Sequence, residues 1–323
     1  MDARAAPSFG DYRSMTIKFS AIAAACAAIL LLLPAQALAC ACGCDVFDVG
    51  TSALFPSGHG QGTVFGEYDY MDQNRNWHDD SHAPAANNDD KQIRSNFFTL
   101  GGEYMFHCGF GVMLEVPLTN RLFRTDDGSG VGSFNHTALG DIRLMGVYSG
   151  FSKSMTSGII FGIKLPTGDF RYSGFDRDTS IGSGSTDLLL GAYHMGQIDR
   201  TGDWTYYGQV LLQAPMAYQD GYRPGDDLNG AVGVYYRGLT FGGDKFKLSP
   251  VAQLIASTRT RDGGPESDLP NSGYQRLMIA PGLQLDTPDW RLYGDVEFPV
   301  WQHVNGNQLV APALFKFIVS KSF

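Results

Sequence analysis

The chain has 323 residues and a net charge of −9, with 43% hydrophobic, 12% aromatic and only 18% charged residues. An acidic chain without a basic cluster is a poor partner for nucleic acid, so no nucleic acid is expected among its partners. Its 40 glycines, 15 tyrosines and 21 phenylalanines suit strands, tight turns and belts of aromatic side chains.

The N-terminus has the pattern of a secretory signal. Lys18 precedes an uncharged run from Ala21 to Leu33, and the small-residue triplet Ala37-Leu38-Ala39 follows. This run is shorter than the roughly 20 residues of a spanning helix, so residues 1–39 are predicted to be a signal peptide cleaved before Cys40. Residues 1–14 carry mixed charge and no pattern, which fits a start assigned too early.

Residues 40–60 form a predicted periplasmic segment that opens with Cys40, Cys42 and Cys44. These thiols could bind a soft metal such as Cu(I) or Zn(II). They could also form disulfides with one another or with Cys108, because the periplasm is oxidising, and the expected periplasmic position of both Cys108 and the N-terminus favours this reading. A third reading makes Cys40 a lipidated residue. The spacing leaves all three readings open.

Alternation of apolar and polar residues, the pattern of a strand with one apolar face, then recurs to the C-terminus. The first half of the chain has five such segments, at residues 63–71, 93–107, 112–118, 142–148 and 159–165. The second half has seven, at residues 188–190, 206–213, 229–237, 247–254, 276–285, 292–300 and 311–319.

The connectors between these segments alternate in length. Long connectors cover residues 72–92, 125–135, 167–185, 215–227 and 260–272, and a loop is expected around Asn305-Gly306-Asn307; the others are short turns. Short periplasmic turns and longer extracellular loops are typical of outer-membrane barrels. Residues 61–323 are therefore predicted to form an all-β, transmembrane antiparallel up-and-down β-barrel of about 12 strands, located in the bacterial outer membrane.

The two faces of the segments differ in polarity. One face is almost purely Val, Leu, Ile, Phe and Tyr, as expected of a surface in contact with outer-membrane lipid, and the charged face would line the lumen. The predicted pore-lining residues are Glu67, Asp69, Glu103, Glu115, Asp141, Arg143, Lys164, Arg276, Asp295 and Glu297. Acids outnumber bases in this set, so cations or neutral solutes should pass more readily than anions. For any single residue of this set, a cross-strand ion pair that rigidifies the interior is the commoner role.

The last segment ends on Phe323, after Phe315 and Phe317 on the apolar face. A terminal strand of this kind is expected to be recognised by the barrel assembly machinery. Within the connector 72–92, the dense run Trp77-His78-Asp79-Asp80-Ser81-His82 could hold a cation, although a solvated acidic loop is the commoner arrangement. No catalytic motif is present, because neither a Gly-x-Ser-x-Gly elbow nor a His-Glu-x-x-His pair occurs. The chain is not expected to be an enzyme.

Two motifs carry a family resemblance. Lys164-Leu165-Pro166-Thr167-Gly168-Asp169 follows an alternating strand, and Gly182-Ser183-Gly184-Ser185-Thr186-Asp187-Leu188-Leu189-Leu190-Gly191 comes after it. The stretch from about Gln61 to Phe323 resembles the outer-membrane family labelled "MetA-pathway of phenol degradation". The resemblance implies a transporter-like β-barrel for small compounds, aromatic or hydrophobic ones included.

The sequence thus predicts an outer-membrane channel or facilitator for small-molecule solutes. The alternative is a structural or metal-handling surface protein, in which the barrel is an anchor and the cysteine cluster or the acidic loop does the work. Apart from Cu or Zn at the cysteine cluster, no cofactor is expected.

Overall fold

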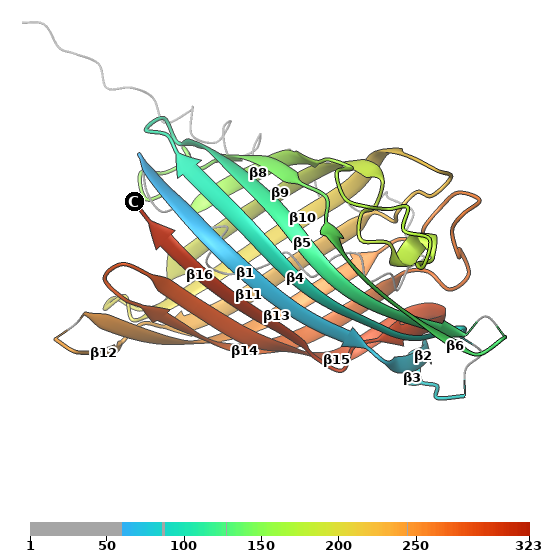
Figure 1. Cartoon of the computed structure of the whole chain (residues 1–323). Coiled ribbons are helices and arrows are strands. Elements are labelled where there is room, and N and C mark those ends of the chain that lie inside the picture. The colour runs from blue at the N-terminus through green and yellow to red at the C-terminus, as the bar shows by residue number, and fades with distance from the viewer. Residues whose placement is uncertain (1–59, 86–87, 127, 244) are drawn as a thin grey trace, which may run out of the picture. The chain divides into compact units, whose positions relative to one another are not determined.

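The computed structural model describes residues 60–85, 88–126, 128–243 and 245–323, which form a closed antiparallel barrel of 12 strands (Figure 1). The predicted fold class is confirmed. The residues predicted to form the signal peptide, and Cys40, Cys42 and Cys44, lie outside the described residues. No helix in the described part of the chain is long and apolar enough to cross a membrane.

Ten of the twelve positions in the ring are each occupied by one continuous strand. They are β1 (Gln61–Gln73), β4 (Asp90–Met105), β5 (Phe110–Asp126), β8 (Ser157–Lys164), β9 (Ser185–Gln197), β10 (Trp204–Tyr218), β11 (Asp227–Tyr236), β13 (Phe246–Arg259), β14 (Tyr274–Asp286) and β15 (Arg291–Val310). The terminal strand β16 (Leu314–Ser322) is the eleventh. The twelfth position is shared by β6 (Val131–Leu139) and β7 (Arg143–Tyr148), which pair with successive parts of β5.

Three short strands lie outside this ring. β2 (Arg75–Asp79) pairs with the far end of β15, and β3 (Ser81–His82) pairs with β2. β12 (Leu239–Phe241) pairs with the start of β13. A 3₁₀ turn, η1 (Arg177–Thr179), lies in the connector between β8 and β9.

The ring closes where the first strand meets the last. β1 pairs with β4 on one side and with β16 on the other, over the register Thr63 with Ser322 to Met71 with Leu314. Phe323 extends this pairing, because its amide donates to the Gly62 carbonyl at 2.9 Å and the Gly62 amide donates back at 2.9 Å. Closure leaves no unpaired strand edge in the ring, which is how a barrel satisfies its backbone in lipid.

The two faces of each strand have opposite polarity, as the alternation predicts. On β16, Phe315 and Phe317 are exposed on the outer surface, whereas the alternate residues Leu314, Lys316 and Ile318 are buried inside. The outer surface carries many further exposed apolar side chains, of which Leu100 is 69% exposed. A soluble protein would bury such a surface, so its exposure indicates a lipid-facing wall.

Two of the loops predicted from the sequence contain strand residues instead. The reason is the same in both, because strands of the barrel extend beyond the closed ring and pair there with a neighbouring strand. β6 starts at Val131, inside the connector predicted for residues 125–135, because it pairs with the long extension of β5. The loop expected around Asn305-Gly306-Asn307 lies within β15, where Asn307 pairs with His78 of β2. Both extensions occur at the end of the barrel opposite the C-terminus.

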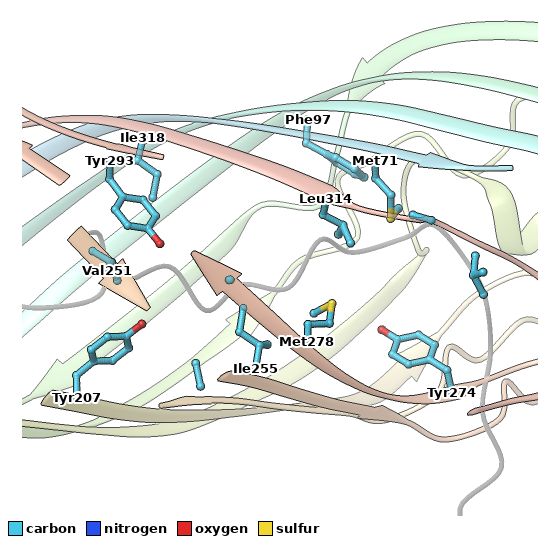
Figure 2. Close-up of a cluster of buried hydrophobic side chains, with 14 of the residues drawn as sticks. Met71, Phe97, Tyr207, Val251, Ile255, Tyr274, Met278, Tyr293, Leu314 and Ile318 are labelled. Atoms are coloured by element: carbon cyan, nitrogen blue, oxygen red, sulfur yellow. The ribbon is translucent and has the colours of Figure 1, made fainter. Parts of the chain in front are cut away.

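The barrel interior is not an open pore along its whole length, because side chains fill part of it. Figure 2 shows one cluster of buried side chains that converge from opposite walls, including Phe97, Tyr207, Met278 and Tyr293. Most of its members are aromatic or branched aliphatic residues that alternate along their strands with lipid-facing positions. The interior therefore combines apolar packing with the charged groups described next.

Candidate functional site

All ten predicted lumenal side chains are turned away from the outer surface. Eight are buried, and Glu67 and Arg143 are half-buried. Nine lie on strands of the ring, whereas Asp141 lies in the break between β6 and β7. The structure brings most of them into two groups, one on β1, β15 and β16 and the other around β7 to β9. Their part in lining a pore stays a prediction.

The first group is centred on Lys316 of β16. Its Nζ lies 2.9 Å from Glu67 Oε1 and 3.1 Å from Asp69 Oδ1, both on β1. Asp295 stands directly opposite Lys316 on β15, and Glu297 follows two residues later on the same face. One ammonium thus faces four carboxylates, which gives this part of the lumen an acidic balance.

Asp295 is held by a polar network that crosses the interior. Gln253 of β13 donates through Nε2 to Asp295 Oδ2 at 2.8 Å and to the Tyr293 hydroxyl at 2.5 Å. The Tyr207 hydroxyl of β10 donates to the side-chain oxygen Oε1 of Gln253, and the Tyr293 hydroxyl donates to Asp295 Oδ2. Figure 2 shows the Tyr207 and Tyr293 rings on opposite walls. The network fixes the carboxylate in place and ties β10, β13 and β15 together.

The second group is centred on Lys164 at the end of β8. Its Nζ lies 2.8 Å from Asp187 Oδ2 and 3.5 Å from Asp141 Oδ2, and it donates to the Ser183 hydroxyl at 2.8 Å. Gln213 also donates to Asp187 Oδ2, at 2.8 Å. The Lys164 charge is therefore compensated within the wall, which corresponds to the cross-strand ion-pair reading.

Two other bases of the predicted set are engaged as well. Arg143 Nη1 lies 3.8 Å from Glu115 Oε2, and Arg143 Nη2 donates to Gln213 Oε1 at 3.3 Å. The Arg276 guanidinium lies over the Tyr274 ring, 4.0 Å from its centroid. Glu103 differs from all of these, because neither of its carboxylate oxygens has a hydrogen-bond partner among the described residues.

The two motifs that carry the family resemblance meet at the break between β6 and β7. The Thr167 hydroxyl donates to the Gly140 carbonyl at 3.1 Å and accepts from the Ile142 amide at 2.8 Å. Asp141 accepts from the amides of Gly168 and Ser183, each at 2.9 Å. These bonds replace the strand pairing that is lost at the break. The motifs therefore have a structural task, which is to anchor both ends of the connector between β8 and β9.

That connector folds against the inner wall. Arg121 of β5 is fully buried, and its Nη1 donates to the carbonyls of Thr179 and Ser180 at 2.7 and 2.9 Å. Its Nε donates to the Ser95 hydroxyl at 2.9 Å. On the same connector, Tyr172 stacks on the His136 ring of β6 with centroids 4.0 Å apart. The segment 165–184 thus narrows this end of the barrel.

Neighbouring connectors lock onto this segment. Arg171 pairs with Asp220, with Nε and Oδ2 2.6 Å apart, and the Arg177 guanidinium lies over the Tyr222 ring at 4.6 Å. Tyr222 in turn donates to Asp262 at 2.6 Å. Burial raises the pKa of Asp178 to about 7, with further contributions from the carboxylates of Asp90, Asp262 and Asp176. The constriction therefore contains an acid that titrates near neutral pH.

Several residues of these groups were not in the predicted set. Lys316 lies on the polar face of the predicted segment 311–319, whereas Asp187 and Arg121 lie on β9 and β5 beyond the predicted segments 188–190 and 112–118, because both strands are longer than predicted. Arg259, which lies 3.5 Å from both Asp227 and Asp262, belongs to the same class. What the pattern does not give is which of these charges meet, because that depends on strand register.

The proposed metal and disulfide residues are placed only in part. Cys108 is exposed in the turn between β4 and β5, and the cysteines with which it could pair lie outside the described residues. In the acidic connector, His78 contacts Asn307 at 2.8 Å and Asp80 contacts His303 at 2.8 Å. Among the residues that the structure describes, no group of three or more His, Cys, Asp or Glu side chains is arranged to hold a metal ion.

Comparisons with known proteins support the fold. No family model and no curated protein matches the chain. Among solved structures, an outer-membrane channel from Pseudomonas putida is similar with a TM-score of 0.66 and 11% identity, over 85% of this chain and 100% of that one. The β domain of the Bordetella autotransporter BrkA gives a TM-score of 0.49 at 13% identity, over 82% and 100% of the two chains.

A third similar structure is the CymD monoaromatic hydrocarbon channel, with a TM-score of 0.42 and 8% identity, over 82% of this chain and 89% of that one. The first of these likenesses shows that the chain has the fold of an outer-membrane barrel. The two below 0.5 are too distant to support an argument. Membership of the phenol-degradation family stays a prediction.

Proposed function

We propose that the protein is a channel or facilitator of the bacterial outer membrane for small solutes, aromatic and hydrophobic compounds included. The observation that carries the proposal is the polarity of the closed ring, which exposes apolar side chains outside and collects charged and polar side chains inside. This distribution fits a wall that separates lipid from a solute path.

The interior contacts favour neutral solutes or cations. Lys164 and Lys316 are both within 3.1 Å of carboxylates, so their charges are largely compensated. Asp295 and Glu297 are two further acidic side chains on the wall beside Lys316. An anion would therefore find few uncompensated positive groups along this wall, whereas an uncharged ring compound would face the tyrosines and methionines of the interior.

The proposal includes the route by which the protein reaches its membrane. Residues 1–39 would direct export, and the strand ending at Phe323 would be recognised by the barrel assembly machinery. Outer-membrane lipid would cover the apolar outer wall. Membership of the phenol-degradation family is part of the same proposal, supported by the way its two motifs anchor the inward connector.

Liposome swelling with the purified mature protein tests the proposal. Swelling should be faster than in protein-free liposomes for small neutral sugars and for phenol-sized ring compounds, and heat-denatured protein should give no increase. Impermeable liposomes, together with stoichiometric metal on the purified protein, would support the metal-handling surface protein instead. Growth of a deletion strain on aromatic carbon sources then identifies the solute class.

A further inference from the structure

Methionine side chains gather at the end of the lumen where the short turns lie. One buried cluster consists of eight residues, and four of them are Met105, Met113, Met145 and Met155. They are between 0% and 6% exposed. The larger interior cluster of 17 residues contains only two methionines, Met71 and Met278. Packing in the larger cluster thus uses few methionines, and the concentration of thioethers here is local.

The strand register brings these side chains together. Met113 of β5 stands directly opposite Met145 of β7, and Met105 of β4 stands opposite Gly111. A Cβ atom added to Gly111 would lie only 2.2 Å from Met105 Sδ, so the thioether occupies the space above that glycine. At Gly162 an added Cβ would lie 2.4 Å from the Leu144 carbonyl oxygen and 2.8 Å from Met145 Cγ, so the chain beside Met145 is also closely packed.

Glu103 belongs to the same site. It lies two residues before Met105 on the inward face of β4 and directly opposite Met113. It is 4% exposed, and both carboxylate oxygens lack a hydrogen-bond partner among the described residues. The nearby Arg143 is already engaged with Glu115 and Gln213. A buried carboxylate without a hydrogen-bond partner is costly, and a cation bound beside it would remove that cost by compensating its charge.

The chemistry of the ligands selects the ion. Thioethers are soft ligands that select Cu(I) among the biological metals, whereas Ca(II) and Mg(II) require oxygen ligands. One carboxylate balances one positive charge, so a monovalent ion leaves the buried site neutral. We propose that Met105, Met113, Met145 and Glu103 form a binding site for a soft monovalent cation such as Cu(I), with Met155 completing its wall. This inference does not depend on which solute the channel carries.

Methyl NMR of the folded full-length mature protein, labelled at the methionine methyl groups and titrated with Ag(I), tests the site. Ag(I) stands in for Cu(I) because it is monovalent, soft and stable to oxidation. The probe protein has Cys40, Cys42, Cys44 and Cys108 replaced by serine, so that thiolates do not compete, and the unsubstituted chain is titrated alongside. The signals of Met105, Met113 and Met145 should shift saturably, while those of Met71 and Met278 stay in place.

Matched variants measure the affinity. Met113→Leu and Met145→Leu should each weaken Ag(I) binding by at least about tenfold, as loss of a metal contact commonly does. Met278→Leu, which removes an equally buried methionine from the other cluster, should change it less than about twofold. Glu103→Gln should weaken binding severalfold without altering the folded gel mobility.

Four outcomes would overturn the inference. They are no shift of the cluster signals, an equal shift of Met71 and Met278, unchanged affinity in both leucine variants, and an equal response to Ca(II). The titration of the probe protein, in which all methionines are retained, decides the question even if a methionine or Glu103 variant fails to fold, because it compares methionines within one protein. Failure of this test leaves liposome swelling unaffected, so the two proposals are judged separately.

Discussion

Replacement of Lys316 probes the charged interior most directly. Lys316 is buried between Glu67 and Asp69, at 2.9 and 3.1 Å. At the effective dielectric constant of about 20 that reproduces measured charge interactions, each contact contributes an attraction of about 5 kcal/mol before desolvation is subtracted. Removal of one member of a buried ion pair typically costs about 3–5 kcal/mol in net stability, because the remaining charges lose their partner. Lys316→Met should therefore destabilise the barrel by that amount.

The assay is urea unfolding of the barrel in lipid vesicles, followed by the gel mobility that separates folded from unfolded barrels. Adding Glu67→Gln and Asp69→Asn to Lys316→Met should recover about half or more of the loss, since the two carboxylates in direct contact with Lys316 are then no longer buried without a partner. Lys153→Gln, at an exposed position in the turn between β7 and β8, is the matched control and should change stability by less than about 0.5 kcal/mol. A stable Lys316→Met barrel, or a triple variant no better than the single one, would refute the reasoning.

Three further predictions concern the constriction and the outer wall. Arg121→Ala should release the segment 165–184 and make it cleavable by trypsin in intact cells, because three hydrogen bonds from a charged donor are lost, each contributing about 1.5–3 kcal/mol. Since the pKa of Asp178 is raised to about 7, protonated Asp178 stabilises the packed segment, and this stability should fall as the pH rises from about 4 to 7. Asp178→Asn should remove that fall, measured as trypsin protection at about pH 5 and pH 8. Leu100→Arg, on the exposed outer wall, should cost about 2–4 kcal/mol in vesicle unfolding.

Each of these predictions has a result that contradicts it. Arg124→Ala changes an exposed arginine on the same strand, and equal trypsin cleavage of this control and Arg121→Ala would remove the anchoring role. Protection that increases with pH, or that is unchanged by Asp178→Asn, would show that this carboxyl does not control the segment. A Leu100→Arg barrel as stable as the parent in lipid would mean that this wall does not face the membrane.

The architecture was predictable because its signal is repetitive. The inward and outward faces of β16 follow directly from the alternation through Phe315, Lys316 and Phe317, and the count of alternating segments gives the strand number. Each strand repeats the same information, so an error at one boundary does not change the fold.

The errors and omissions arose where the signal depends on pairing between distant strands. The strand extension through Asn305-Gly306-Asn307 looks like a turn in sequence, and only its contact with β2 makes it a strand. In the same way, no local pattern shows that Lys164 meets both Asp141 and Asp187. Register determines these contacts, and register is a property of the closed ring.

The central claim is that solutes pass along the inner face of this barrel, and neighbouring residues of β10 offer the most direct test. Gln209 is buried inside, and Val210 is 42% exposed on the outer wall. In a chain with its native cysteines replaced by serine, Gln209→Cys treated with a bulky charged methanethiosulfonate reagent should lose most of its conductance in planar bilayers. Val210→Cys treated in the same way should keep its conductance. Equal responses of the two variants, or no response at Gln209→Cys, would contradict the account.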